Sequence, residues 1–139
     1  MPTTFLPEQV PLQRLQDAGY DRHGVEVWVK RDDLIHRQVS GNKWRKLKYV
    51  LADALEKAAQ QLITFGGAYS NHLLALAAVG HHQQVRTVGV VRGEEPSEYS
   101  PTLKACQELG MQLEFISRSD YKLKTEEAFQ QNLPCSIGS

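Results

Sequence analysis

Short apolar runs alternate with helical patterns from residue 62 onward, and this alternation constrains the fold of the chain most strongly. The strand candidates are residues 62–65, 86–91 and 113–116, and helix candidates include residues 71–79 and 125–133. Strands and helices that alternate at this spacing predict parallel β-α-β units with right-handed crossovers. The expected fold class is therefore α/β.

Capping residues mark the ends of two of these helices. Ser70 is a good N-cap for the helix over residues 71–79, which is apolar on nearly every side and should be buried. Ser100 as N-cap, Pro101 as first helical residue and Gly110 beyond the end bracket a further helix.

The N-terminal part of the chain follows a different pattern. Residues 1–15 carry three prolines, which favour an extended segment laid over another surface. Residues 25–29 alternate as Val-Glu-Val-Trp-Val and predict a half-buried strand. Asp32 and Asp33 follow it; without further ligands nearby, adjacent carboxylates are more often turn residues or partners of Arg and Lys than a metal site.

Residues 40–49, Ser-Gly-Asn-Lys-Trp-Arg-Lys-Leu-Lys-Tyr, start a helix with unfavourable charges. The first turn of a helix favours Asp or Glu, but here the cations are Lys43, Arg45, Lys46 and Lys48. The helix itself is supported by apolar residues at three- and four-residue spacing, namely Leu47, Leu51, Ala54, Leu55 and Ala58. Stacked cations and free N–H groups predict an anion site, and the alternative is a solvated face of lysines.

Lys43 is the candidate nucleophile of this stretch. It follows a flexible turn at Gly41 and Asn42. Neighbouring positive charges disfavour the ammonium form, so we expect a lowered pKa for this lysine, and a neutral amine is the form that attacks a carbonyl.

Residues 66–72, Gly-Gly-Ala-Tyr-Ser-Asn-His, form a second motif between a predicted strand and a predicted helix. Open α/β sheets bind ligands at such positions, where glycines admit close approach and a helix start offers N–H donors. A tight turn followed by a serine cap is the alternative interpretation. The spacing fits neither a nucleotide phosphate loop nor a dinucleotide fingerprint, so we discount ATP and NAD.

Composition limits the remaining possibilities. With 139 residues the chain has the size of one domain, and 16 basic and 16 acidic residues give a net charge of zero. Nothing therefore suggests binding to nucleic acid or to an anionic membrane. No apolar run approaches the roughly 20 residues of a membrane helix, and no signal peptide is evident, so we expect a cytoplasmic protein. Cys106 and Cys135 show no metal spacing and should be reduced.

The two motifs together resemble the family of 1-aminocyclopropane-1-carboxylate deaminases and D-cysteine desulfhydrases. The resemblance runs from about Pro7 to Leu133 and depends chiefly on Gly-Asn-Lys-x-Arg-Lys-Leu and on Gly-Gly-Ala-Tyr-Ser-Asn-His. It implies a pyridoxal 5′-phosphate enzyme with the three-layer, parallel-sheet α/β fold of the tryptophan synthase β subunit, known as fold type II. The expected activity is that of a deaminase or lyase that converts a small amino acid to ammonia and a 2-oxo acid.

The resemblance also implies roles for individual residues. Lys43 would be the Schiff-base lysine and would carry the proton at the substrate's α-carbon, and Lys46 would face the cofactor phosphate. Asn71 would bond the ring hydroxyl of the cofactor, and Ser70 would hold the substrate carboxylate together with the helix start at Asn71 and His72. In members that act on the cyclopropane substrate, the serine has also been proposed as a nucleophile or proton carrier.

Members of that family are roughly twice as long as this chain. The resemblance implies that residues 1–45 are an N-terminal segment of the large cofactor domain and that residues 46–139 are most of the small α/β domain. The chain would be a fragment, weakly active or inactive alone, of a protein that is a homodimer at full length. The alternatives are a non-catalytic α/β protein that binds an anion or a partner and, with less support, a nucleotide-binding domain.

Overall fold

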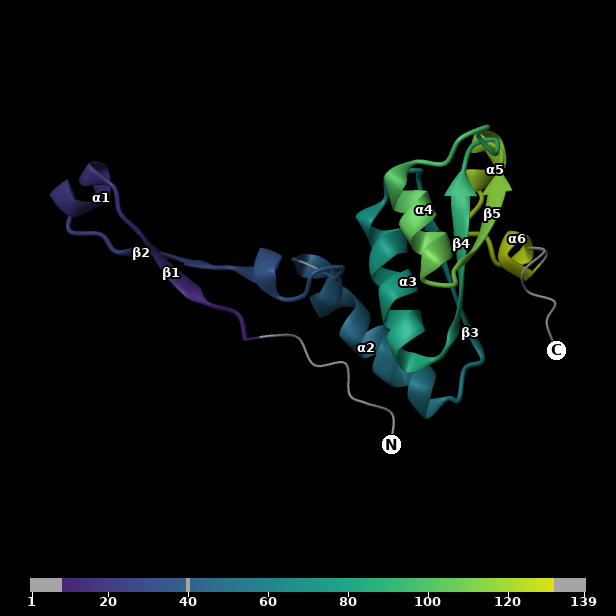
Figure 1. Cartoon of the computed structure of the whole chain (residues 1–139), viewed down its shortest axis with the longest axis horizontal. Coiled ribbons are helices and arrows are strands. Elements are labelled where there is room, and N and C mark those ends of the chain that lie inside the picture. Colours follow the sequence, from purple (N-terminus) through teal and green to yellow (C-terminus); the bar gives the residue numbers. More distant parts are fainter. Residues whose placement is uncertain (1–8, 40, 132–139) are drawn as a thin grey trace.

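A three-stranded parallel sheet lies at the centre of the structure, a computed structural model that describes residues 9–39 and 41–131 (Figure 1). Its strands are β3 (Gln61–Gly66), β4 (Arg86–Arg92) and β5 (Gln112–Ile116), in the order β3-β4-β5. Gly66 pairs with Val91 in the first parallel ladder and Arg92 pairs with Ile116 in the second. The predicted parallel β-α-β units are confirmed.

Strand β4 forms the middle of the core because it is covered on both faces. Its residues 87–91 are all buried, as expected for a central strand rich in β-branched side chains. Val88 and Val90 pack on one face of the sheet with Phe65 and Ile116, whereas Val91 joins the larger cluster under the helices of the other face.

Helices cover the sheet on both sides, as Figure 1 shows. The helices α3 (Asn71–Gln83) and α4 (Pro101–Glu108) lie on one face, and α2 (Asn42–Glu56) packs against α3. The short helices α5 (Arg118–Tyr121) and α6 (Glu127–Gln131) follow β5, and Phe129 of α6 packs against Val88 and Val90. This arrangement of helix, sheet and helix confirms the predicted three-layer α/β fold.

Helix α3 is buried almost completely, as its apolar sequence predicted. Its buried residues are Leu73, Ala75, Leu76, Ala77, Ala78, Val79 and Gly80. A Cβ added to Gly80 would lie 2.2 Å from Thr87 Cγ2, so only glycine allows α3 to approach β4 this closely. The N-caps predicted for α3 and α4 are confirmed, since the side chains of Ser70 and Ser100 accept hydrogen bonds from the N–H groups of Leu73 and Leu103.

Two predictions about helix extent need correction. Helix α2 buries Leu47, Leu51 and Ala54, but Leu55 is 42% exposed and Ala58 lies beyond the last residue of the helix. The predicted helix over residues 125–133 is α6, which is shorter within the described residues, and α5 was not predicted. Residues 132–139, which include Pro134 and Cys135, lie outside the described residues.

The N-terminal part is a hairpin that extends away from the sheet (Figure 1). Strands β1 (Leu12–Leu15) and β2 (Val27–Lys30) pair antiparallel, with α1 (Ala18–Arg22) between them and the 3-10 helix η1 (Asp32–Leu34) after them. The predicted strand is confirmed with shifted bounds. The extended segment over residues 1–15 is a paired strand at its end, rather than only a segment laid over a surface, and residues 1–8 lie outside the described residues.

Cys106 is free and fully buried, and burial raises the pKa of its thiol to about 11. It therefore stays protonated at neutral pH and is a core residue. In the part of the chain that the structure describes, no cluster of three or more His, Cys, Asp or Glu residues is suited to hold a metal, and no helix has the length and apolar character needed to cross a membrane.

Candidate functional site

Helix α2 starts at Asn42 without the usual compensation of its positive end. Its N-cap is Gly41, which has a φ of +63° and contributes no capping side chain, and its first turn holds no acidic residue. Lys43 is the second helical residue and is partly buried, whereas Lys46 is exposed. The predicted cation-rich helix start is therefore present; Ser40, the first residue of the motif, lies outside the described residues.

Asp32 holds this helix start at two points. Its carboxylate accepts hydrogen bonds from Arg45 Nε at 2.6 Å and Arg45 Nη2 at 2.8 Å, and its backbone oxygen accepts one from the Gly41 N–H at 2.6 Å. The hydrogen bonds from Arg45 lower the pKa of Asp32, so the carboxylate is ionised at neutral pH. One of the four cations is thus neutralised within the protein; the sequence suggested a basic partner for Asp32 but did not identify it as Arg45.

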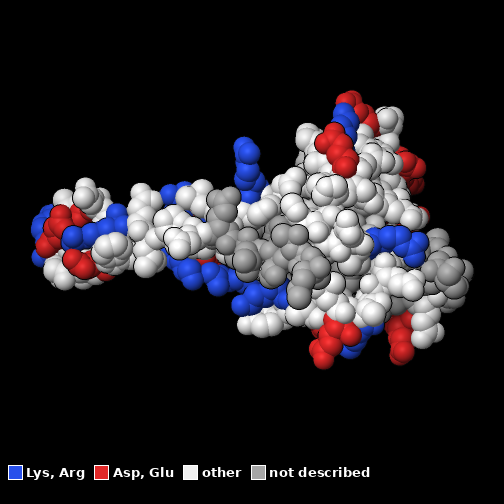
Figure 2. All heavy atoms as spheres, turned by 60° about the horizontal axis from the view of Figure 1, so that its bottom comes forward, with Lys and Arg blue, Asp and Glu red and all other residues white. Residues whose placement is uncertain are grey.

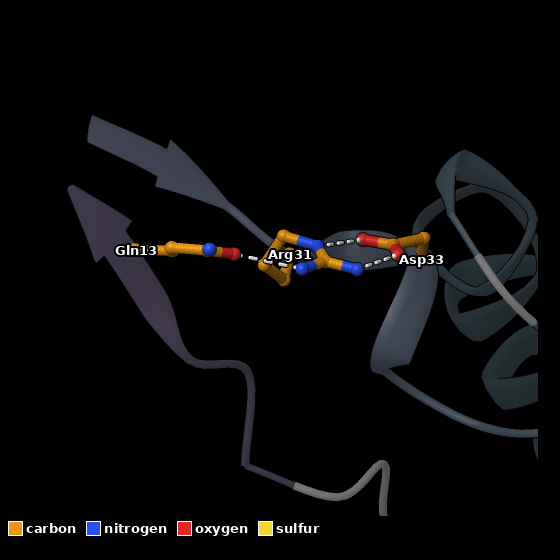
Figure 3. Close-up of polar contacts among 3 residues, drawn as sticks. All are labelled: Gln13, Arg31 and Asp33. Carbon is orange, nitrogen blue, oxygen red and sulfur yellow. Dashed lines mark hydrogen bonds and ion pairs between the residues drawn. The ribbon is translucent and has the colours of Figure 1, made fainter. Parts of the chain in front are cut away.

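Arg31 connects the hairpin to the same segment (Figure 3). Its Nη1 donates to Gln13 Oε1 at 2.8 Å, and its Nε and Nη2 donate to the two carboxylate oxygens of Asp33 at 2.9 and 2.7 Å. These bonds lower the pKa of Asp33. Both aspartates therefore pair with arginines, which confirms the interpretation that they are partners of Arg.

The turn after β3 is shaped by Gly66. A Cβ at this position would lie 2.7 Å from Ser70 Oγ and 2.7 Å from Leu73 Cγ, so only glycine allows the strand end to approach α3. A Cβ at Gly67 would meet no described atom within 4 Å, which leaves the backbone of the turn open on that side. Ser70 Oγ accepts a hydrogen bond from the Leu73 N–H at 3.4 Å, and its own proton remains to be donated.

Ser100 ties the same turn to helix α4. Its hydroxyl donates to the backbone oxygen of Ala68 and accepts a hydrogen bond from the Leu103 N–H at 3.2 Å. Ser100 is buried, so a single side chain both caps α4 and holds the turn. The sequence predicted the cap, but not the bond to a residue 32 positions away.

His72 shows that the two motifs meet. This side chain is half-buried in the first turn of α3, and its pKa is lowered by burial and then by the charges of Lys43 and Lys46. Helix α2 also packs against α3, and together these observations indicate that the starts of the two helices are neighbours. The imidazole is consequently neutral at neutral pH. Figure 2 shows Lys and Arg side chains gathered where the hairpin joins the rest of the molecule, the region in which α2 begins.

The groups around these helix starts can bind an anion. The first N–H groups of a helix lack intrahelical partners, and Ser70 occupies only that of Leu73. Asn71 and His72 thus present N–H donors beside the Ser70 hydroxyl and the lysines of α2. Asn71 is exposed, and the nearby Tyr69 is 77% exposed, whereas Trp44 packs against the core.

Comparison with known proteins identifies the family. A family model described as "Pyridoxal-phosphate dependent enzyme" matches residues 3–134. The chain belongs to this family. The resemblance on which the expected cofactor rested is thereby confirmed at the level of the family.

Individual relatives narrow the comparison. A bifunctional D-cysteine desulfhydrase/1-aminocyclopropane-1-carboxylate deaminase of Arabidopsis thaliana, described as mitochondrial, is 33% identical over 129 residues, which are 88% of this chain and 32% of the relative. A D-cysteine desulfhydrase of Salmonella typhimurium is 43% identical over 75 residues, which are 54% of this chain and 23% of the relative. The crystal structure of an ACC deaminase homologue superposes with a TM-score of 0.66 at 29% identity and covers 94% of this chain and 37% of that one.

The chain therefore spans about a third or less of the length of these curated relatives. From the aligned lengths and shares, the Salmonella typhimurium relative is about 2.3 times and the Arabidopsis thaliana relative about 2.9 times as long as this chain, where the sequence led us to expect roughly twice. The solved structure supports the fold type II assignment over nearly the whole chain.

Proposed function

We propose that this chain carries the lysine-bearing part of a pyridoxal-phosphate-dependent deaminase or lyase. The proposed substrate is a small amino acid, either 1-aminocyclopropane-1-carboxylate or D-cysteine, and the products include ammonia and a 2-oxo acid. The names of the relatives support this reaction class. The single observation that carries the proposal is the packing of α2, which bears the lysine motif, against α3, which begins in the Ser-Asn-His motif; the charges of Lys43 and Lys46 act on His72 accordingly.

Lys43 is the proposed catalytic residue. Its position in the first turn of α2, partly buried beside His72, suits a lysine that holds the cofactor covalently and then moves the proton at the substrate's α-carbon. When bound, pyridoxal phosphate supplies an electron sink for the bond broken at that carbon. The protein's task is to orient the bond and to place the proton carrier next to it.

Lys46 and Asn71 are the proposed non-covalent contacts to the cofactor. Lys46 lies one turn after Lys43 and is exposed, so its ammonium group is available to a phosphate group. Asn71 is exposed at the start of α3, where its side-chain amide can bond the ring hydroxyl. Both proposed contacts use hydrogen-bond donors that lie at the starts of α2 and α3.

Ser70 and His72 are the proposed contacts to the substrate carboxylate, together with the helix start at Asn71. The Ser70 hydroxyl keeps a proton to donate because its oxygen is the acceptor toward Leu73. A neutral imidazole at His72 can donate one further N–H without adding a positive charge. Ser70 is also a candidate nucleophile or proton carrier, as in relatives that act on the cyclopropane substrate.

The proposal extends to domains, assembly and location. We assign residues 1–45 to the large cofactor domain and residues 46–139 to the small domain, which is supported by the separation of the hairpin from the three-stranded sheet (Figure 1). Exposed apolar side chains of the hairpin, such as Trp28 at 53%, suit a surface that further chain or a second subunit covers. We propose a cytoplasmic homodimer at full length with no nucleic-acid or membrane partner, in keeping with the net charge of zero.

Covalent trapping tests the cofactor assignment. The purified chain is mixed with pyridoxal phosphate, reduced with borohydride and digested, and the modified peptide is identified by mass spectrometry. We expect attachment at Lys43, loss of attachment in Lys43→Ala, and unchanged attachment in Lys48→Ala, which removes a lysine from the same helix. Modification spread over several lysines, or unaffected by Lys43→Ala, would contradict the assignment.

Turnover tests the enzymatic half of the proposal. Release of ammonia from 1-aminocyclopropane-1-carboxylate or D-cysteine should be weak with this chain and absent in Lys43→Ala. A ligand that binds equally well to both proteins without turnover would instead favour the non-catalytic alternative, an α/β protein that binds an anion.

A further inference from the structure

A hollow lies at the carboxyl ends of β4 and β5, and none of the residues that line it belongs to α2. It has a volume of about 540 Å³ and is lined by Arg92, Gly93, Glu94, Ser117, Arg118 and Ser119. This volume falls within the range of about 300–1,000 Å³ that is usual for small-molecule sites. The carboxyl ends of parallel strands are also the edge at which open α/β sheets bind ligands.

The two arginines of this hollow carry uncompensated charge. Among the described residues neither Arg92 nor Arg118 pairs with a carboxylate, in contrast to Arg31 and Arg45. Arg92 is held in place by the ring of Tyr121, whose centroid lies 5.7 Å from the guanidinium carbon. A guanidinium stacked on a ring keeps its N–H groups for a ligand, because the stacking uses the face of the group and not its edge.

The serines add a donor at the same place. Ser117 Oγ accepts a hydrogen bond from the Asp120 N–H at 3.1 Å and lies 2.7 Å from Ser119 Oγ. That contact uses one of the two hydroxyl protons, so the other remains available to a ligand. The Gly93 N–H donates to the Ile116 oxygen at 2.8 Å, which fixes the start of the loop after β4 against the end of β5.

Gly93 sets the course of the backbone along one side of the hollow. Its φ of +110° is a conformation that other residues rarely adopt, and a Cβ there would meet no described atom within 4 Å. The hollow is thus formed by the segments that follow β4 and β5, and it offers forked cationic donors and a hydroxyl donor.

We propose that this hollow binds a small phosphate monoester. Two guanidinium groups and a hydroxyl match the dianionic charge and the three acceptor oxygens of such a group, and arginine is the side chain best suited to bond phosphate through two oxygens. The volume leaves room for the organic part of the ester. Glu94, which also lines the hollow, disfavours additional negative charge and can accept a hydrogen bond from a hydroxyl of the ligand. The site is independent of the reaction proposed at Lys43.

Titration by NMR tests this site in the ¹⁵N-labelled chain. The probe is glycerol 2-phosphate, and glycerol and sodium chloride at matched ionic strength are the reference solutes. We expect saturable shifts of the amide signals of Gly93, Ser117 and Ser119 with the ester only. Arg118→Gln should weaken binding by about tenfold or more, because hydrogen bonds to a charged group are lost.

Arg37→Gln provides the matched control. Arg37 is another exposed arginine without a carboxylate partner among the described residues, and it lines a different hollow beside His36. Its replacement changes the net charge equally and should leave the affinity unchanged. Arg92→Gln serves as a second test variant and should also weaken binding.

Three results would overturn the inference. Shifts confined to the starts of α2 and α3 would mean that the ester binds only at the lysine site. Equal weakening in Arg37→Gln would show a general effect of charge. Unchanged affinity in both Arg92→Gln and Arg118→Gln would exclude the two guanidinium groups as ligands.

Discussion

Alanine at position 66 would test how tightly the turn before α3 is built. The added Cβ would lie 2.7 Å from Leu73 Cγ and from Ser70 Oγ, where ordinary contact begins at 3.4 Å. One partner or the other must therefore move by about 0.7 Å, and Leu73 is fully buried, with no room toward solvent. Overpacking of this kind typically costs about 1–3 kcal/mol of unfolding free energy.

Gly67→Ala is the matched control, because it places the same methyl group one residue further along the turn. No described atom lies within 4 Å of the position that this methyl group would take, and the φ of Gly67 is not positive. Alanine there restricts only the unfolded chain and should stabilise the protein by about 0.4–1 kcal/mol. Urea denaturation should thus separate the two variants by about 1.5–4 kcal/mol. Gly66→Ala should also bind pyridoxal phosphate and substrate less tightly, since Ser70 is displaced.

Two outcomes would refute this reasoning. Unfolding of Gly66→Ala at the wild-type urea concentration would mean that the turn yields without cost and that Ser70 is not held by it. Equal destabilisation by Gly67→Ala would mean that any side chain in the turn is harmful, so the close approach at Gly66 would not be the cause.

Two further predictions concern the same region. Lys46→Gln should raise the pKa of His72, because one of the charges that lower this pKa is removed, whereas Lys48→Gln should leave it unchanged. NMR titration of the imidazole measures the pKa in both variants. Equal pKa shifts in the two variants would contradict the assignment. Ser100→Ala should lower the unfolding free energy measured in urea by about 1–2 kcal/mol, because helix α4 loses its N-cap. It should also weaken cofactor binding, because the backbone oxygen of Ala68 loses its hydrogen bond to Ser100. Wild-type cofactor affinity in this variant would show that this hydrogen bond does not position the turn.

Local sequence signals were sufficient for most of the fold. The apolar runs predicted β3, β4 and β5, and the serine caps, Pro101 and Gly110 predicted the starts and one end of two helices. These signals act within a few residues, and burial against the sheet reinforces them. Helices α1 and α5 were missed because, at five and four residues, they are too short to show a helical period.

The site was less accessible to sequence reasoning. The two motifs were found individually, and the resemblance to a family supplied the roles of their residues. The pairing of Asp32 with Arg45 and of Ser100 with Ala68 spans 13 and 32 positions, and no local pattern encodes such contacts. They arise only when the segment before α2 and the start of α4 are folded against the two motifs.

Three of the four cations that first marked helix α2 fall into two groups in the folded chain. Asp32 neutralises Arg45, whereas the charges of Lys43 and Lys46 remain and act on His72. Because the pKa of His72 lies below its ordinary value of 6.5, the folded chain binds fewer protons there than the unfolded chain, and stability falls as the pH drops below about 6.5. An anion bound between the helix starts would offset the lysines and raise that pKa. Anion binding and stability at acidic pH are therefore coupled through His72. An anionic ligand should stabilise the chain more at pH 5 than at pH 8, once the change of the ligand's own charge between these pH values is taken into account.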